Sequence, residues 1–282
     1  MELKLFKTLW GCNGSVEAAC ANAIEQGFDG IEGPAPTAAT SRAQMRAAIV
    51  SQQLDYIAEI TTAGSYVPEL RATPEQHLQS LREKLQCSLE LQPLSISCLA
   101  GSDAWSEREQ LLFFERALRL IETIEVPVSF ETHRSRSLFN PWITQRIAGE
   151  FPELLLTCDF SHWCVVCERL LDAEFHGITG LARQARHIHA RVGYDQGPQV
   201  PHPAAPEYQD ALAAHRHWWE LIWQSQYERG YTVTTMTPEF GPDGYLHCEP
   251  FTGRPTGDLE QINTWMAAAE RGHFAQWLLS QG

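Results

Sequence analysis

The feature of this sequence that most constrains its fold is a regular alternation of strand-like and helix-like segments. The strand-like segments are short and rich in β-branched and apolar residues. Between them, apolar residues recur at helical spacing, as in the stretch 16–24. Eight strand-like segments follow one another along the chain: LKLFKTLWG, FDGIEG, DYIAEITT, LSISCLAG, VPVSFETHR, ELLLTCDFSHW, RHIHARVG and TVTTMTPEFG.

This alternation predicts an α/β protein in which strands and helices form repeated pairs. Eight strand–helix units in 282 residues indicate a (β/α)8 TIM barrel, with residues 1–282 forming one domain. An open doubly wound sheet is the alternative, but no G-x-G-x-x-G motif follows the first strand segment. Capping boxes at Thr73/Gln76 and Ser106/Glu109 predict where two of the helices begin.

Composition and charge indicate whether the protein is expected to bind membranes or nucleic acids. Apolar residues make up 44% and charged residues 20% of the chain, as in a water-soluble globular protein. No stretch approaches the roughly 20 apolar residues that span a bilayer, and the N-terminal MELKLFKTLWG lacks the features of a signal peptide. We therefore expect a cytoplasmic protein without a membrane partner. The net charge of −14 repels phosphate backbones and argues against a nucleic-acid partner.

Polar side chains stand at the ends of four successive strand segments. In a TIM barrel the active site lies at the carboxyl ends of the strands, and alternation along a strand decides which side chains point inward. With this parity the last four strands deliver one potential metal ligand each to the same rim: Glu131, Asp159, His189 and Glu239. Three carboxylates and one imidazole suit a single divalent ion such as Mn²⁺, Mg²⁺ or Co²⁺.

Each of these four residues also has a simpler interpretation. A single Glu at a strand end is more often a solvated rim residue or a salt-bridge partner, and a single inward His is more often a hydrogen-bonded core residue. The combination on consecutive strands favours the metal site, because three clustered carboxylates without a cation would repel one another and at least one would protonate.

The motifs around these residues resemble those of a known superfamily. The segments FET at Glu131, CDFSHW at Asp159, HIHARVG at His189 and PEFG at Glu239 are similar to the xylose-isomerase-like barrels, in the sugar phosphate isomerase/epimerase branch that also includes endonuclease IV. The resemblance covers nearly the whole chain. It implies that the Glu, Asp, His, Glu set binds the metal and that Glu131 and Glu239 also form the proton-transfer pair.

The resemblance also points to residues that contact substrate. It assigns His162, three residues after Asp159, to the substrate, and FDGIEG suggests that Glu32 lines the pocket. The segment ETHR, with His133, and the position of Arg191 depart from the ketose epimerase patterns, and both are further candidates for substrate contacts. The loops Gly193–Tyr208 and Pro242–Gly257 are long enough to be functional, and His202 in the first of them could reach a substrate.

These residues predict an isomerase or epimerase that acts on a small sugar-like keto or hydroxy compound. A metal chelated by a carbonyl and a neighbouring hydroxyl acidifies the adjacent C–H, and carboxylates move the proton. The alternatives are a dehydratase of the inosose or dehydroshikimate type, an endonuclease IV-like repair enzyme, and a barrel subunit without catalytic activity. Whether the chain forms a homo-oligomer is left open.

Overall fold

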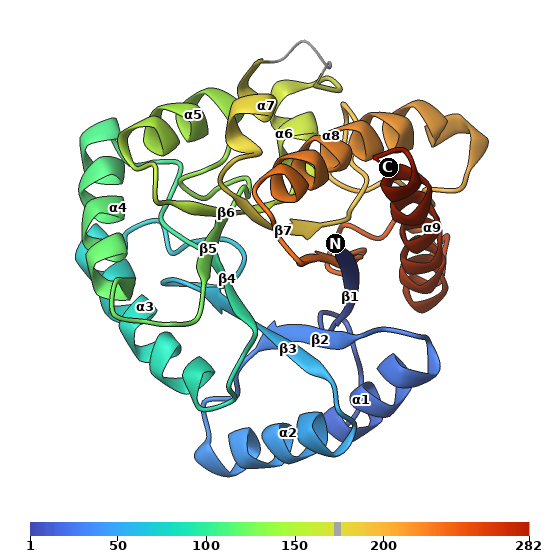
Figure 1. The fold of residues 1–282 in the computed structure, drawn as a ribbon, viewed down its shortest axis with the longest axis horizontal. Helices are drawn as coiled ribbons and strands as arrows, with labels where there is room; N and C mark the ends of the chain where they lie inside the picture. The colour runs from blue at the N-terminus through green and yellow to red at the C-terminus, as the bar shows by residue number, and fades with distance from the viewer. Residues whose placement is uncertain (172–175, 282) are drawn as a thin grey trace.

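Residues 1–171 and 176–281, which the computed structural model describes, form a closed barrel of eight parallel strands (Figure 1). Each strand pairs with the next one in the sequence, and β1 closes the ring by pairing with β8, with Leu3 opposite Thr234. The predicted fold class is confirmed. The strands are β1 (Glu2–Thr8), β2 (Gly30–Pro34), β3 (Asp55–Thr61), β4 (Ser95–Leu99), β5 (Val128–Glu131), β6 (Leu155–Cys158), β7 (Ala185–His189) and β8 (Val233–Thr237).

The helices surround this barrel, as Figure 1 shows. Most of them follow a strand and return the chain to the start of the next one, which is the right-handed connection that parallel strands require. They are α1 (Val16–Glu25), α2 (Ala39–Ser51), α3 (Pro74–Leu89), α4 (Glu107–Ile121), α5 (Pro141–Glu150), α6 (Ser161–Cys167), α7 (His176–Leu181), α8 (Gln209–Glu228) and α9 (Leu259–Leu279), with a 3₁₀ turn at Pro206–Tyr208.

The helix starts agree with the local chemistry of the sequence. The Thr73 side chain accepts a hydrogen bond from the Gln76 backbone at the start of α3, and Ser106 does the same with Glu109 at the start of α4. Both predicted capping boxes are therefore present. Asp258 caps α9 by accepting from the backbone of Glu260 and Gln261. These side chains satisfy N–H groups that have no partner within the helix.

Side chains alternate between two environments along each strand. Outward residues such as Ile96, Phe130 and Ile188 are fully buried and pack under the helices. Inward residues fill the barrel, and many of them are polar. The hydroxyl of Thr157 lies 2.7 Å from that of Ser129 and 3.0 Å from that of Ser97. This small hydroxyl cluster forms part of the barrel's interior.

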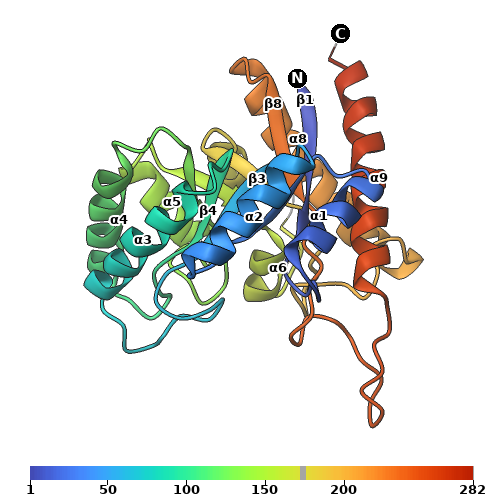
Figure 2. The ribbon, with the colours of Figure 1, turned by 90° about the horizontal axis from the view of Figure 1, so that it is seen from below.

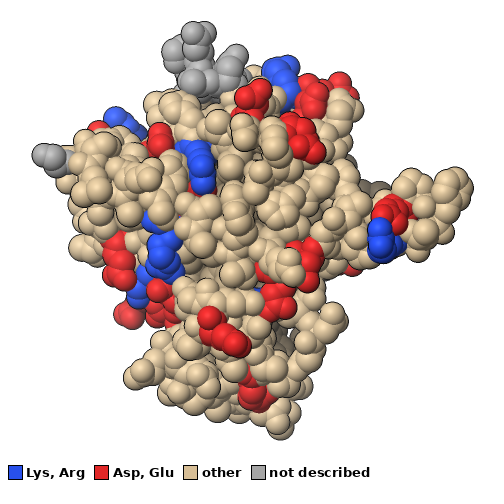
Figure 3. Space-filling view, turned by 90° about the vertical axis from the view of Figure 1, so that its right-hand side faces the viewer, with Lys and Arg blue, Asp and Glu red and all other residues tan. Residues whose placement is uncertain are grey.

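The ends of the strands carry connections of different length. In Figure 2 the β8–α9 connection projects from the end of the barrel opposite to the chain's N-terminus. The loop from Pro242 onwards in this connection includes Tyr245, which is 4% exposed. None of the described helices is both long and apolar enough to cross a bilayer. The face shown in Figure 3 carries scattered acidic and basic side chains and no continuous basic surface.

Candidate metal centre

The four predicted ligands meet at the carboxyl ends of the strands. Glu131 and His189 are the last residues of β5 and β7, Asp159 directly follows β6, and Glu239 lies two residues beyond β8. One ligand atom from each of the four lies within 4.8 Å of those of the others, and all four residues are buried. The inward parity predicted from the sequence therefore brings these side chains together; their roles stay a prediction.

Two buried atoms in this group have no hydrogen-bond partner. His189 Nδ1 lies 3.1 Å from Glu239 Oε2 and 3.5 Å from Glu131 Oε1, but forms a hydrogen bond with neither. Glu131 Oε2 is likewise buried and unpartnered. Buried polar atoms normally have a partner. An imidazole nitrogen and a carboxylate oxygen without hydrogen-bond partners, in a group whose ligand atoms lie within 4.8 Å of one another, are a donor set that fits a divalent metal ion.

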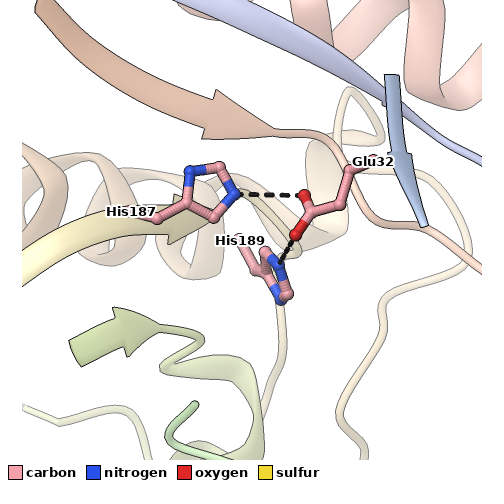
Figure 4. A group of neighbouring side chains, drawn as sticks. All are labelled: Glu32, His187 and His189. Atoms are coloured by element: carbon pink, nitrogen blue, oxygen red, sulfur yellow. Dashed lines mark hydrogen bonds and ion pairs between the residues drawn. The ribbon is translucent and has the colours of Figure 1, made fainter. Parts of the chain in front are cut away.

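A carboxylate outside the ligand group, that of Glu32, contacts His189, as Figure 4 shows. Glu32 Oε1 lies 3.1 Å from His189 Nε2, and Glu32 Oε2 lies 3.1 Å from His187 Nε2. The other nitrogen of His187 lies 2.8 Å from the hydroxyl of Thr235, and the Thr237 hydroxyl donates to Glu32. Each oxygen of Glu32 therefore accepts from an imidazole N–H, which leaves Nδ1 of His189 turned to the ligand group.

This contact also sets the charge of Glu32. Burial alone would raise the pKa of this carboxyl, but His189 and His187 outweigh it and hold the pKa far below its usual range. Glu32 is 2% exposed and is not among the residues that line the cavity described below. The structure therefore places it behind a predicted ligand, whereas the sequence motif suggested a place in the pocket wall.

Arg191 is the main cation of the site. Its Nη2 contacts Asp159 Oδ2 and lies 3.5 Å from Glu239 Oε2, and it lies 2.7 Å from His162 Nε2. The guanidinium lies 4.8 Å from the ring centre of Tyr245 and 5.7 Å from that of Trp10. From the sequence, Arg191 was expected only as a candidate substrate contact. Its spacing of two residues from His189 already implied that it would share the same inward face.

The balance of charge leaves the site with an excess of negative charge. The guanidinium of Arg191 and the protonated ring of His189 face three carboxylates, and loss of the ring proton would leave Arg191 alone against all three. Burial, together with the neighbouring Glu239 and Asp159, raises the pKa of Glu131 to about 7, although His189 lowers it. Burial and Glu239 also raise the pKa of Asp159. A divalent cation would supply the missing charge and keep all three ionised.

A cavity of about 370 Å³ opens onto this group. Glu131, Glu239 and Arg191 line one side of it, together with His133, which was predicted to contact substrate. A further lining residue, Glu59 of β3, was not predicted. Its inward parity with Thr61, at the end of the segment DYIAEITT, could have identified it. The volume is within the range typical of small-molecule sites.

The two remaining substrate candidates lie differently. His162 is fully buried against Arg191 and packs at an angle against His133, with ring centres 3.9 Å apart, but it is not among the cavity-lining residues. Burial, His133 and Arg191 hold its pKa well below the usual value, so the ring is neutral. His202 packs against Trp265, with ring centres 5.7 Å apart, and also lies outside the cavity lining.

Comparison with known proteins shows similarity in structure only. No protein-family model matches the sequence, and no curated protein matches it significantly. Among solved structures, the 3-keto-D-glucoside 4-epimerase YcjR from E. coli has a TM-score of 0.64 at 13% identity, covering 96% of this chain and 100% of the other. The probable 3-DHS dehydratase AsbF from Bacillus anthracis has a TM-score of 0.61 at 16% identity, with 96% and 99% covered.

A third solved structure is that of a protein with a different kind of activity. Endonuclease IV from Thermus thermophilus has a TM-score of 0.60 at 14% identity, covering 98% of this chain and 100% of the other. Three unrelated activities thus share one architecture, so the likeness alone does not select among them. It shows that the chain has the xylose-isomerase-like (β/α)8 barrel fold.

Proposed function

We propose that this protein is a divalent-metal-dependent isomerase or epimerase of a small sugar-like compound with adjacent carbonyl and hydroxyl groups. The observation that carries the proposal is the buried group of Glu131, Asp159, His189 and Glu239, whose ligand atoms lie within 4.8 Å of one another beside the cavity. Two of its atoms, His189 Nδ1 and Glu131 Oε2, have no other partner.

The surrounding residues support a metal rather than a purely structural role. Glu32 accepts from His189 Nε2, and such a carboxylate typically fixes the orientation and tautomer of a metal-binding imidazole. The uncompensated carboxylates match the charge of a divalent ion. Neighbouring Glu239, Glu32 and Glu131 raise the pKa of His189 well above its usual value despite its burial, so metal binding would have to displace a proton from this ring.

Bound there, the metal would polarise the substrate carbonyl and stabilise the negative charge that develops when a neighbouring carbon loses its proton. Glu131 and Glu239 both line the cavity and would remove and return that proton. Return to the opposite face of the carbon gives epimerisation, and return to its neighbour gives isomerisation.

The acidic balance of the chain favours this function over that of an endonuclease. A nuclease of this architecture would have to hold a duplex by its phosphates, and such contacts need clustered Lys and Arg. The net charge is −14, and no continuous basic surface appears on the face in Figure 3. We therefore expect no tight binding of abasic-site DNA at about 150 mM salt, where non-specific binding is typically ~10⁻⁴–10⁻⁶ M.

The experiment is a screen for solvent proton exchange. Purified protein is loaded with Mn²⁺, Co²⁺ or Mg²⁺ and incubated in D₂O with ketoses, inososes and keto-acids, and deuterium incorporation is followed by NMR. We expect metal-dependent exchange at one carbon of at least one compound, lost on chelation. Exchange that continues unchanged after the metal has been removed would contradict the proposal.

A further inference from the structure

We propose that Glu59 is a substrate-recognition residue that binds an uncharged hydroxyl group on the wall of the cavity opposite Arg191. This inference rests on the proposed function for the reacting end of the substrate. It adds that the other end is a neutral, hydroxylated chain or ring and is not phosphorylated at the position that meets Glu59.

The position of Glu59 in the barrel supports this role. It lies on β3 at an inward position, two residues before Thr61, and both residues line the same cavity as Glu131 and Glu239. In the closed order of eight strands, β3 is four strands away from β7, which carries His189 and leads to Arg191. A substrate that reaches the metal group therefore has Glu59 on its far side.

Glu59 differs from the other acidic groups of the site in having no partner. Among the described residues it makes no hydrogen bond and no ion pair, whereas Glu32 is bound by two imidazoles and Asp159 by Arg191. The nearby cations are engaged elsewhere. Lys84 donates to the carbonyl of Thr61 at 2.5 Å, and Arg136 donates to that of Thr62 at 2.7 Å.

The chemistry around Glu59 determines what it can bind. Burial, and then the neighbouring carboxylates of Glu239 and Glu131, raise the pKa of Glu59 to about 8. Either form of this group pairs with a hydroxyl, because the carboxylate accepts a hydrogen bond from it and the protonated acid donates one and accepts another. A hydroxyl is its natural complement, because it also donates and accepts. A phosphate at this position would meet the Glu59 carboxyl and, across the cavity, the carboxylates of Glu131 and Glu239.

The same cavity fits a sugar. Trp10, Tyr66 and Tyr245 line it, and the ring centres of Trp10 and Tyr245 are 5.1 Å apart in an edge-to-face arrangement. Aromatic faces of this kind cover the C–H surface of a polyol while the hydroxyls turn to polar groups. A ligand that fills the cavity and leaves the Glu59 carboxyl unpaired would bind more weakly than one that forms a hydrogen bond with it.

The test compares variants of Glu59 on matched substrates. The probe is whichever of D-fructose, D-tagatose and D-allulose exchanges fastest with the Mn²⁺-loaded wild type, with its 4-, 5- and 6-deoxy analogues and its 6-phosphate. The variants are Glu59→Leu, which removes both hydrogen bonds, and Glu59→Gln, which keeps a donor and an acceptor. Glu69→Gln, an exposed glutamate of the following loop, is the control.

We expect one deoxy analogue to lose about 10- to 100-fold in kcat/KM with the wild type. Glu59→Leu should lose a similar factor on the parent ketose and no longer distinguish the two. Glu59→Gln should lose less than Glu59→Leu and still distinguish them, while Glu69→Gln stays near the wild type. Metal content should be the same in all variants, which separates recognition from metal binding. The 6-phosphate should be the poorer substrate.

Three results would overturn the inference. The first is a Glu59→Leu variant that still discriminates against the deoxy analogue as strongly as the wild type. The second is a 6-phosphate that is preferred over the free ketose. The third is a metal-loaded wild type that exchanges a phosphorylated or acidic compound but none of the neutral ketoses and inososes, which rejects a neutral far end and leaves the metal centre in place. Failure to bind metal at all would instead reject the proposed function.

Discussion

The two halves of the barrel contribute to the site in different ways. Strands β5 to β8 and their ends supply Glu131, Asp159, His189, Arg191 and Glu239, a dense group in which every member contacts another. At the same level, strands β1 to β4 supply mainly apolar and aromatic lining, with Leu9, Trp10 and Leu99 and the separate Glu59.

The half formed by β5 to β8 carries the groups proposed to react, and the half formed by β1 to β4 carries those proposed to recognise the substrate. Charged groups that must act together share one half, where their mutual contacts fix geometry and charge. The other half provides shape and one hydrogen-bonding group. Glu32 is the exception, since it starts on β2 and reaches across the interior to His187 and His189. This division between the two halves predicts which substitutions stop proton transfer, which lower metal affinity, and which change only the free energy of unfolding.

The largest expected effect is on proton transfer from the β5–β8 half. Glu131→Gln and Glu239→Gln should each lower deuterium exchange by about 10²–10⁴-fold, because the amide keeps the shape of the side chain but cannot accept a proton. Exchange is measured starting from each of the two interconverting compounds, and the metal occupancy of each variant is determined. The exposed Glu153→Gln is the control. A metal-loaded variant that exchanges at nearly the wild-type rate would show that the glutamate takes no part in proton transfer.

A smaller effect should follow from breaking the contacts of Glu32 with His187 and His189. In Glu32→Gln the amide nitrogen would face an imidazole N–H, donor against donor, so the orientation of His189 would be lost. We expect metal affinity to fall about 10- to 100-fold, measured by Co²⁺ titration, with a changed absorption spectrum of the bound Co²⁺. Glu59→Gln, a substitution in the same half of the barrel, should leave both unchanged. Equal affinity in Glu32→Gln would mean that Glu32 does not position the ligand.

The third prediction concerns the pH dependence of the free energy of unfolding, which His215 should influence. His215 of α8 accepts a hydrogen bond from the backbone N–H of Gly193 at 3.2 Å through Nε2, and its Nδ1 lies 2.8 Å from the carbonyl of Ala211. Burial lowers its pKa to about 4. Below the unfolded value of about 6.5 the unfolded chain takes up a proton that the folded chain refuses, so stability falls as the pH drops from about 6.5 towards 4.

The expected loss from this residue between pH 7 and pH 5 is about 2 kcal/mol. The free energy of unfolding is measured with urea at both pH values for the wild type and for His215→Gln, whose side-chain oxygen can still accept from Gly193. The variant should lose less stability over this range than the wild type. If both lose the same amount, His215 is not held neutral by the fold.

The smallest effect should come from a helix start outside the barrel. Ser106→Ala removes the capping box of α4 and should cost about 1 kcal/mol of unfolding free energy. Ser106→Asp, which can cap the same N–H, should restore most of it. Metal affinity should not change in either variant, because α4 does not contact the ligand group. A change in affinity would show that the site depends on the outer helices more closely than the comparison implies.

The sequence predicted the fold and the meeting of the four ligands because both follow from local rules. Capping residues such as Thr73 and Ser106 mark helix starts, and parity along a strand places Asp159 and Glu239 on the inward face. The closed parallel order then brings strand ends together at one rim whatever the details of packing.

What the sequence did not predict depends on contacts across the barrel. The pairing of Glu32 with His187 and His189 joins residues more than 150 positions apart, and nothing in FDGIEG distinguishes a pocket-lining glutamate from one turned beneath a histidine. Glu59 lacked a motif altogether. The place of His202 beside Trp265 depends on the path of a long loop, which side-chain periodicity does not specify.

The most direct test of the account is the metal content of the protein and its dependence on Asp159. Wild type and Asp159→Ala are loaded with Mn²⁺, freed of excess metal and analysed by elemental analysis, with unfolding curves to verify that both are folded. The account predicts about one Mn²⁺ per wild-type chain and a marked loss in the variant. Equal metal content in the two, or a wild type that retains none, would contradict it and leave Arg191 as the cation around which the carboxylates are arranged.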